Sequence, residues 1–389
     1  MVALPIPSLE QQVHSQLLRQ LIQQAIIDCG GWLSFAEFMH MALYTSGLGY
    51  YSGGLQKFAD TEKGAGDFVT APEISPLFAQ SIARQAAQIL TASQGNILEL
   101  GAGTGKLAAD LLLELQALHA LPDHYYILDV SDHLRQVQHE TLKNALSDAL
   151  FNRVVWLEKL PENFVGLILA NEVLDALPVH LIYSNKGDLF ERGLAFEGDL
   201  VWQDKPLANK EIAKEAHGYC LPEQYLTEFC PAAKGLIHSL ADALEVGAIL
   251  LIDYGFSARE YYHPQRNQGT LMCHFQHYAH SNPLINIGLQ DITAHVNFSQ
   301  IANLNMAETH NGVSLAGYTT QAQFLMNCGI LDIMAQHSPD SPQYMKLASS
   351  AQKLLSPAEM GELFKVIAFT KNFDAPLLGF LSGDKAHTL

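Results

Sequence analysis

The hydrophobic positions follow two rhythms along the chain, and the change comes near residue 94. From about Ser8 to Leu90 apolar residues recur at helical spacing, with an interruption at Gly30-Gly31 and a last helix expected from about Pro76 to Leu90. Between these helices, residues 45–75 are rich in glycine, which is typical of a functional loop.

Beyond residue 94 short apolar runs alternate with helical segments. The runs NILEL, YYILDV, GLILA and GAILLIDYGF predict buried strands, and the alternation predicts βαβ units with a parallel sheet. A hairpin pattern near 180–204 has Asn-Lys-Gly and Glu-Gly-Asp at its turns, and residues 256–316 look irregular. We expect a helix near 320–327, a strand near 330–334, and ELFKVIAFT as a last strand that closes the sheet.

Composition and charge exclude several classes of partner. The 389 residues include 48% hydrophobic and 16% charged residues, as in an ordinary globular protein, and the net charge is −18. Nucleic acid and anionic membranes attract positive surfaces, so neither is expected, and no apolar run reaches the ~20 residues of a membrane span. Five widely spaced cysteines predict neither disulfides nor a zinc site, and the first residues lack a signal or transit peptide. Both features favour a cytoplasmic protein.

The motif ELGAGTGK carries the strongest chemical signal. Leu100 stands where a Walker loop needs its first glycine, and Lys106 stands where a dinucleotide fold needs a small residue. The remaining pattern has an acidic residue, Glu99, two positions before the alternate glycines at 101, 103 and 105, as in S-adenosylmethionine (SAM) methyltransferases. Bare backbone would let the cofactor approach closely, and a tight strand–helix turn is the alternative explanation of the glycines.

Two groups of acidic residues follow later strands. Asp129 ends YYILD, where a carboxylate can accept the ribose hydroxyls, while Ser131 or Asp132 can cap the next helix. Asn171, Glu172 and Asp175 follow GLILA; if 172–177 is a helical turn, the two acids face the same way and can grip a guanidinium. A capped helix N-terminus explains the same residues equally well.

The histidines of CHFQHYAH, which are His274, His277 and His280, suggest a metal site only weakly. Their spacing of three is not a known ligand pattern, even with Asp291 and His295 nearby, so no metal is predicted.

Six segments together resemble the MidA-like methyltransferases, whose mitochondrial member is a complex I assembly factor that methylates an arginine on a complex I subunit. The segments are GDFVTAPEIS (66–75), ELGAGTGKL (99–107), YYILDVSDHLRQVQ (125–138), ANEVLDALPV (170–179), LLIDYGF (250–256) and GTLMCHFQH…NPLINIGLQDITAHVNF (269–298). The resemblance implies an α/β, class I SAM-dependent methyltransferase fold: a Rossmann-like seven-stranded sheet with a helical N-terminal region and substrate-side insertions. It implies four parts: residues 1–93 with a lid-like loop, a core over 94–255 with the hairpin insertion, a substrate-side insertion over 256–316, and completion of the sheet over 317–389.

The same resemblance assigns roles to individual residues. The implied SAM-binding residues are Asp67, Thr70, Glu99, Gly101, Gly103, Gly105, Asp129 and Asn171, and the implied catalytic residues at the acceptor pocket are Asn171, Glu172, Asp175 and His295. Ser75 belongs to the lid-like segment, and Asp253, Tyr254 and Asp291 border the pocket. Two departures from the family are expected to matter. Asp129 replaces the glutamate usual in the family, and the presequence of the mitochondrial member is missing, which favours a bacterial cytoplasmic protein.

The expected activity is therefore methyl transfer from SAM, with an arginine of a protein as the favoured acceptor and a complex I subunit as one candidate. A small-molecule O- or N-methyltransferase and a non-catalytic SAM-binding assembly factor remain alternatives. The oligomeric state stays open, with a homodimer among the options.

Overall fold

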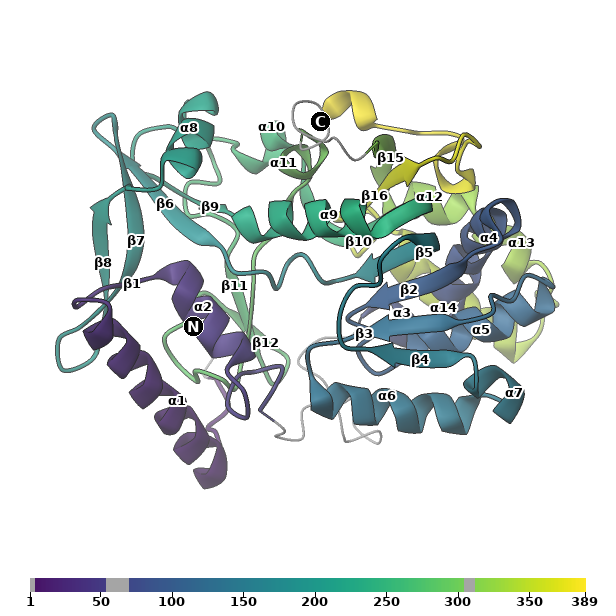
Figure 1. Cartoon of the computed structure of the whole chain (residues 1–389), viewed down its shortest axis with the longest axis horizontal. Helices are drawn as coiled ribbons and strands as arrows, with labels where there is room; N and C mark the ends of the chain where they lie inside the picture. Colours follow the sequence, from purple (N-terminus) through teal and green to yellow (C-terminus); the bar gives the residue numbers. More distant parts are fainter. Residues whose placement is uncertain (1–3, 54–69, 304–311) are drawn as a thin grey trace. The chain divides into compact units, whose positions relative to one another are not determined.

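The computed structural model describes residues 4–53, 70–303 and 312–389 and divides the chain into two compact units (Figure 1). Unit 1 comprises Met1–Phe68, Leu174–Gly235 and Ala258–His295. Unit 2 comprises Val69–Val173, Leu236–Ser257 and Val296–Leu389. Each unit is thus assembled from three stretches of sequence, and its elements come from distant parts of the chain.

Unit 2 is built on an eight-stranded, mostly parallel sheet. Its strands are β2 (Asn96–Leu100), β3 (Tyr125–Leu128), β4 (Val154–Leu157), β5 (Phe164–Asn171), β10 (Leu244–Phe256), β14 (Val296–Asn297), β15 (Ser314–Thr320) and β16 (Phe364–Lys371). The order is β15-β16-β10-β5-β2-β3-β4, and β14 pairs with the end of β10. Along this path β16 alone points in the direction opposite to the other strands. The carboxyl ends of β2, β3, β5 and β10 therefore lie at the same edge of the sheet. The predicted α/β class is confirmed.

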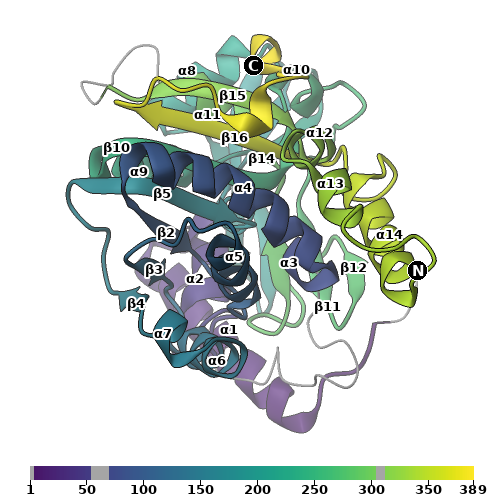
Figure 2. The same cartoon turned by 90° about the vertical axis from the view of Figure 1, so that its right-hand side faces the viewer.

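Helices bury the sheet of unit 2. They are α3 (Ala71–Ile74), α4 (Pro76–Ser93), α5 (Lys106–Ala117), α6 (Asp132–Ala145), α7 (Asp148–Phe151), α9 (Pro231–Ala243), α11 (Phe298–Ala302), α12 (Gln321–Asn327), α13 (Ile330–Met334) and α14 (Pro342–Leu355), with short 3-10 turns η2 (Leu378–Phe380) and η3 (Ala386–Thr388). Alternate residues of the strands, such as Leu167 and Leu169, form one core with α4 and α5 (Figure 2). The intervening Ile168 is also fully buried, so both faces of the sheet are covered, as a parallel sheet requires.

Unit 1 contains two antiparallel sheets. The first has the order β1-β7-β6-β9, with β8 paired to β7; its strands are β1 (Leu33–Ser34), β6 (His180–Asn185), β7 (Asp188–Phe196), β8 (Leu200–Pro206) and β9 (Tyr225–Phe229). The hairpin pattern read near 180–204 corresponds to β6, β7 and β8. The second sheet has the order β12-β11-β13, formed by β11 (Met272–Phe275), β12 (Tyr278–His280) and β13 (Asp291–Thr293).

Four helices complete unit 1: α1 (Leu9–Asp28), α2 (Phe35–Tyr44), α8 (Lys210–Gly218) and α10 (Ala258–Tyr261). Capping boxes begin α1 at Ser8 and α2 at Ser34, where each serine accepts from the third helical N–H and that residue's side chain accepts in return. Leu18, Ile22 and Ile26 of α1 join Phe35 and Phe38 of α2 in the core of this unit.

Two details differ from the sequence prediction. The expected strand near 330–334 is wrong: Ile330–Met334 is helix α13, which begins after Gly329 in a left-handed conformation (φ +79°) and buries Ile330, Ile333 and Met334 at helical spacing. The edge strand of the sheet is not Phe364–Lys371, which lies between two strands, but β15, which begins in the region 256–316 that the sequence pattern predicts to be irregular.

Candidate functional site

The glycine motif forms a left-handed turn between β2 and α5. Gly101, Gly103 and Gly105 have φ values of +60°, +53° and +85°. A Cβ on Gly101 would lie 3.0 Å from Val173 Cγ2, whereas one on Gly103 would meet no protein atom within 4 Å. Gly103 is therefore bare although none of the described residues crowds it, which suits a turn against which a ligand lies. Gly105 has a packing reason, because its Cβ would lie 3.2 Å from Gln138 Cα.

Glu99 lies beneath this turn and is almost fully buried. Its Oε2 accepts a hydrogen bond of 2.7 Å from the Tyr125 hydroxyl. Burial raises the pKa of Glu99 to about 7, the hydrogen bond from Tyr125 lowers it, and nearby Asp129 raises it. The carboxyl is thus poised to change charge near neutral pH.

Asp129 is held at the end of β3 with hydrogen-bonding capacity left over. Its Oδ1 accepts from Ser131 N at 2.9 Å and its Oδ2 from Gln138 Nε2 at 2.8 Å. A carboxylate has about four acceptor sites, so two remain for other donors. Burial raises the pKa of Asp129, and these hydrogen bonds oppose the rise. Ser131, not Asp129, caps α6, accepting from Leu134 N at 3.3 Å.

Gln138 is a residue that sequence reasoning missed. Its Nε2 donates to Gly103 O at 3.1 Å as well as to Asp129, and its Oε1 accepts from Trp156 Nε1 at 3.0 Å. One fully buried amide therefore ties the glycine turn to the carboxylate of Asp129. Its only sequence signal is its place within the YYILDVSDHLRQVQ segment.

The segment Thr70–Ser75 reaches the same turn. Thr104 Oγ1 donates to Glu73 Oε1 at 2.5 Å, which connects α3 to the glycine turn. Thr70 precedes α3, and Ser75 caps α4 by accepting from Leu77 N. Asp67 lies outside the described residues, so its assignment stays a prediction.

The residues after β5 do not form the helical turn that the sequence suggested. Residues 172–177 are a non-helical turn, and Glu172 is left-handed with φ +53° because its N–H donates to Ile252 O on the neighbouring strand. The i, i+3 argument for Glu172 and Asp175 is therefore wrong. Asn171 Nδ2 donates to Glu172 Oε1 at 3.1 Å, and the buried Asn171 Oδ1 has no hydrogen-bond partner among the described residues. An orphaned acceptor at the carboxyl edge of the sheet is the kind of group that a ligand satisfies.

Asp253 and Tyr254 lie near the end of β10. Asp253 is fully buried, and its Oδ1 accepts from Tyr254 N at 2.8 Å. The Tyr254 ring packs edge-on against Phe364, with centroids 5.4 Å apart. For both residues the structure provides a packing role, and their place beside the acceptor stays a prediction.

Unit 1 gathers tyrosines and carboxylates. Tyr51 donates to Asp291 Oδ1 at 2.9 Å, stacks on Tyr44 with centroids 5.6 Å apart, and meets Tyr50 edge-on. Burial, then Asp291, Tyr44 and Asp175, raise the pKa of Tyr51 well above its usual value, so both carboxylates act on this hydroxyl. These five residues, Tyr44, Tyr50, Tyr51, Asp175 and Asp291, are called the tyrosine–carboxylate cluster below. No sequence pattern indicated the tyrosines.

Backbone hydrogen bonds fix the surroundings of the tyrosine–carboxylate cluster. Tyr44 Oη donates to Ala176 O, and Ala294 N donates to Asp175 O, both at 2.9 Å. His295 N donates to Thr270 Oγ1 at 3.0 Å, and this hydroxyl donates to the buried Glu228. The predicted residues Asp175, Asp291 and His295 thus lie within one unit, on segments that are bonded to each other.

The histidines near 274–280 belong to the β11–β12 hairpin. Burial lowers the pKa of His274 to about 4 and also lowers that of His280, while His277 occupies the turn. Within residues 4–53, 70–303 and 312–389, no group of three or more His, Cys, Asp or Glu side chains is arranged to hold a metal ion.

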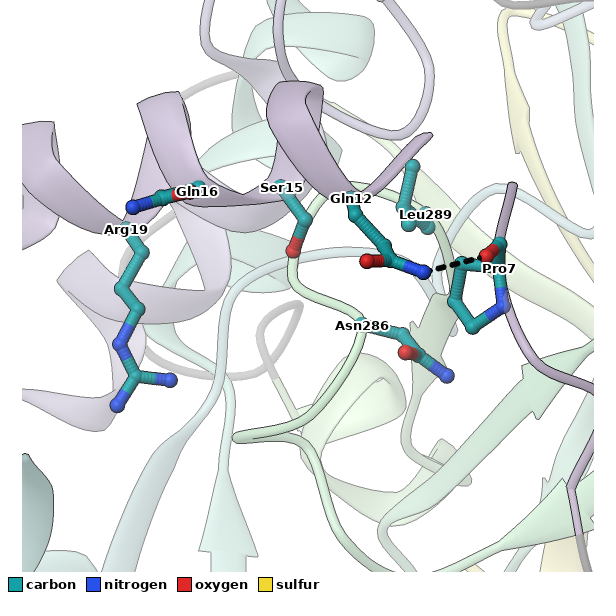
Figure 3. A pocket seen from close by; sticks show the side chains of 7 residues that line it. All are labelled: Pro7, Gln12, Ser15, Gln16, Arg19, Asn286 and Leu289. Atoms are coloured by element: carbon teal, nitrogen blue, oxygen red, sulfur yellow. Dashed lines mark hydrogen bonds between the residues drawn. The ribbon is translucent and has the colours of Figure 1, made fainter. Parts of the chain in front are cut away.

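A pocket of about 200 Å³ lies elsewhere in unit 1, between α1 and the 286–289 turn (Figure 3). It is lined by Pro7, Gln12, Ser15, Gln16, Arg19, Asn286 and Leu289. Gln12 Nε2 donates to Pro7 O at 2.8 Å across it. None of the predicted site residues contributes to this pocket.

In the described part of the chain, no helix combines the length and the apolar character that crossing a membrane demands.

Comparison with known proteins decides the family. The model of a family of S-adenosyl-L-methionine-dependent methyltransferases matches residues 81–319. The chain belongs to this methyltransferase family. Its cofactor is SAM: a crystal structure of a similar Burkholderia thailandensis protein, 47% identical over the whole of both chains with a TM-score of 0.94, contains S-adenosyl-homocysteine.

Curated relatives of the methyltransferase are more distant. The Drosophila melanogaster protein arginine methyltransferase NDUFAF7 homolog is 28% identical, over 91% of this chain and 85% of its own. Human NDUFAF7 is also 28% identical, over 90% of this chain and 82% of its own. The predicted resemblance is therefore confirmed, and the methyltransferase activity follows from it.

Proposed function

We propose that this methyltransferase transfers a methyl group from SAM to the guanidinium of an arginine in a protein. The tyrosine–carboxylate cluster supports this proposal most directly. A guanidinium is planar, always charged and rich in donors, so it pairs with carboxylates and stacks on aromatic faces. Asp175 and Asp291 supply the carboxylates, and Tyr44 and Tyr51 supply stacked rings. The names of the NDUFAF7 relatives, which are protein arginine methyltransferases, point to the same acceptor. A complex I subunit is one candidate for the protein that carries it, as the family resemblance implies.

In this proposal residues of the chain bind the cofactor and the guanidinium, orient both, and neutralise the positive charge of the guanidinium. Bound SAM supplies an electrophilic methyl group. Glu99, Gly101, Gly103 and Asp129, with Thr70 and Asn171, hold the cofactor, and Asp129 accepts the two ribose hydroxyls. Asp175 and Asp291 bind and orient the guanidinium, His295 lies in the same unit as both, and the role of Glu172 at the end of β5 stays a prediction. The nitrogen–carbon bond forms as the carbon–sulfur bond breaks, and a carboxylate receives the proton that the methylated nitrogen releases.

The decisive experiment supplies the purified protein with methyl-labelled SAM and a bacterial extract that is separated into protein and small-molecule fractions. We expect label in protein, recovered as methylarginine by mass spectrometry, together with S-adenosyl-homocysteine release. Label confined to the small-molecule fraction would instead support the small-molecule methyltransferase, and cofactor binding without any turnover would support the assembly factor.

The pH dependence of SAM binding tests the proposed role of Glu99. With a pKa near 7, the carboxyl is largely neutral below that pH and attracts the ammonium of SAM only once it ionises. We expect affinity, measured by calorimetry, to rise about tenfold from pH 5.5 to 7.5 in the wild type and to stay flat in Glu99→Gln.

The same shift affects stability with the opposite sign. Because the folded pKa of Glu99 lies above its ordinary 4.5, the contribution of this group to the free energy of unfolding is complete below pH 4.5 and is lost as the pH rises through 7. Urea unfolding of the ligand-free protein should show this fall, and Glu99→Gln should reduce it. Parallel curves for the two proteins would contradict both effects.

Gln138→Leu tests whether the geometry around Asp129 matters for binding. The substitution leaves Asp129 Oδ2, Gly103 O and Trp156 Nε1 without their buried partner. We expect SAM affinity to fall about tenfold although Gln138 need not touch the cofactor. Gln136→Leu, at an exposed position of the same helix, is the matched control and should bind as the wild type does.

A further inference from the structure

One face of α1 carries an apolar ridge that the described part of the chain leaves uncovered. Leu9, Val13, Leu17 and Leu21 recur every fourth residue, and they are 78%, 52%, 48% and 45% exposed. The opposite face of the same helix, with Leu18, Ile22 and Ile26, is buried in the core of unit 1. Burial within the unit therefore explains one apolar face of α1 but not the other.

The ridge is close to symmetric about its middle. Its four residues span about 18 Å of helix, centred at the height of residue 15. In an antiparallel pair of such helices, Leu9 of one copy meets Leu21 of the other, and Val13 meets Leu17. Ridges of i, i+4 residues interdigitate in the commonest class of helix packing, with axes crossing at about 50°.

The pocket of Figure 3 adds a hollow beside the ridge. Gln12 and Gln16, which line it, each precede a ridge residue and so lie about 100° around the helix from it. A two-fold interface joins the same surface of two copies, so it needs a surface that is complementary to itself. Exposed leucines next to a pocket on the same helix meet this need, because a leucine of each copy can enter the pocket of the other.

The charges favour a second copy over other occupants. The whole chain carries −18, but the only charged residues of α1 before Asp28 are Glu10 and Arg19, and Arg19 is paired with Asp199. Two acidic molecules therefore meet here with little repulsion, and an antiparallel arrangement keeps the two Glu10 side chains apart. A helix that binds anionic lipid needs several Lys or Arg residues on its polar face, which α1 lacks.

We propose that the ridge is the interface of a homodimer, in which α1 of one molecule packs antiparallel on α1 of another. The ridge is short, so the buried area lies near the lower end of the ~1,200–2,000 Å² of stable complexes, and the dimer is reversible.

Sedimentation equilibrium of the full chain between 1 and 100 µM is the test. The wild type should shift from monomer to dimer over this range, and Leu17→Glu should weaken the dimer at least tenfold. The matched control Leu331→Glu, which replaces a leucine of 51% exposure in unit 2, should dimerise as the wild type does. Circular dichroism and a thermal unfolding curve of each variant verify that it is folded.

Cross-linking gives the orientation. In a background without the exposed Cys29 and Cys220, a mixture of Val13→Cys and Leu17→Cys chains, whose new thiols meet near the crossing point, should form the mixed disulfide faster than either chain pairs with itself. A wild type that stays monomeric, a dimer unchanged by Leu17→Glu, or flotation with anionic vesicles that Leu17→Glu abolishes would each overturn the proposal.

Discussion

Replacing Asp129 with alanine is expected to weaken binding of SAM and S-adenosyl-homocysteine at least 100-fold. The carboxylate has two acceptor sites beyond those filled by Ser131 N and Gln138 Nε2, and the proposal gives both to the ribose. A hydrogen bond to a charged group contributes about 1.5–3 kcal/mol, and two of them correspond to at least a hundredfold in affinity. Calorimetry on the purified variant measures the loss directly.

The matched control for this prediction is Asp132→Ala. Asp132 is exposed at the first position of α6, three residues along the chain, and removing it takes away the same charge. Its affinity should stay within about threefold of the wild type. If Asp129→Ala, shown to be folded by circular dichroism, binds the cofactor normally, then the ribose is held elsewhere and the role of Asp129 is only to fix Ser131 and Gln138.

The parts of the site that could be predicted from sequence are those encoded locally. Glu99 lies near the end of β2, and the glycines and Asp129 follow β2 and β3, so their place at the carboxyl edge of a parallel sheet follows from the alternation of strand and helix. Gln138 escaped because its three partners come from β3, the glycine turn and Trp156, and no local pattern connects them.

The differences between the prediction and the structure have specific physical causes. ILDIM is too short for its apolar content to distinguish a strand from a helix, and the left-handed Gly329 and the packing of Ile330 and Ile333 decided for the helix. In β15, Gly317 interrupts the apolar pattern. A Cβ at this position would lie only 2.4 Å from Cδ1 of the Phe380 ring, so the packing requires glycine. Tyr51 escaped for the same reason as Gln138: its partner Asp291 is 240 residues away.

Asp291→Asn is expected to separate acceptor binding from cofactor binding. The amide keeps the shape of the side chain and can still accept from the Tyr51 hydroxyl, but it removes one of the two charges that the proposal places against the guanidinium. Loss of a charge from a buried ion pair costs about 2–5 kcal/mol, so kcat/KM for an arginine-bearing protein should fall about 100-fold or more.

SAM affinity of Asp291→Asn should stay unchanged, because Asp291 belongs to the tyrosine–carboxylate cluster and none of the proposed cofactor contacts involves it. Asp188→Asn, an exposed aspartate of β7 in the same unit, is the matched control and should retain full activity. Tyr51→Phe should give a smaller loss than Asp291→Asn, since it keeps both the ring that stacks on Tyr44 and the carboxylate. If Asp291→Asn has the wild-type kcat/KM on an arginine-bearing protein, the charge of Asp291 does not contribute to recognition of the guanidinium. The tyrosine–carboxylate cluster would then not be the acceptor site, and Glu172 would be the next acidic residue to test.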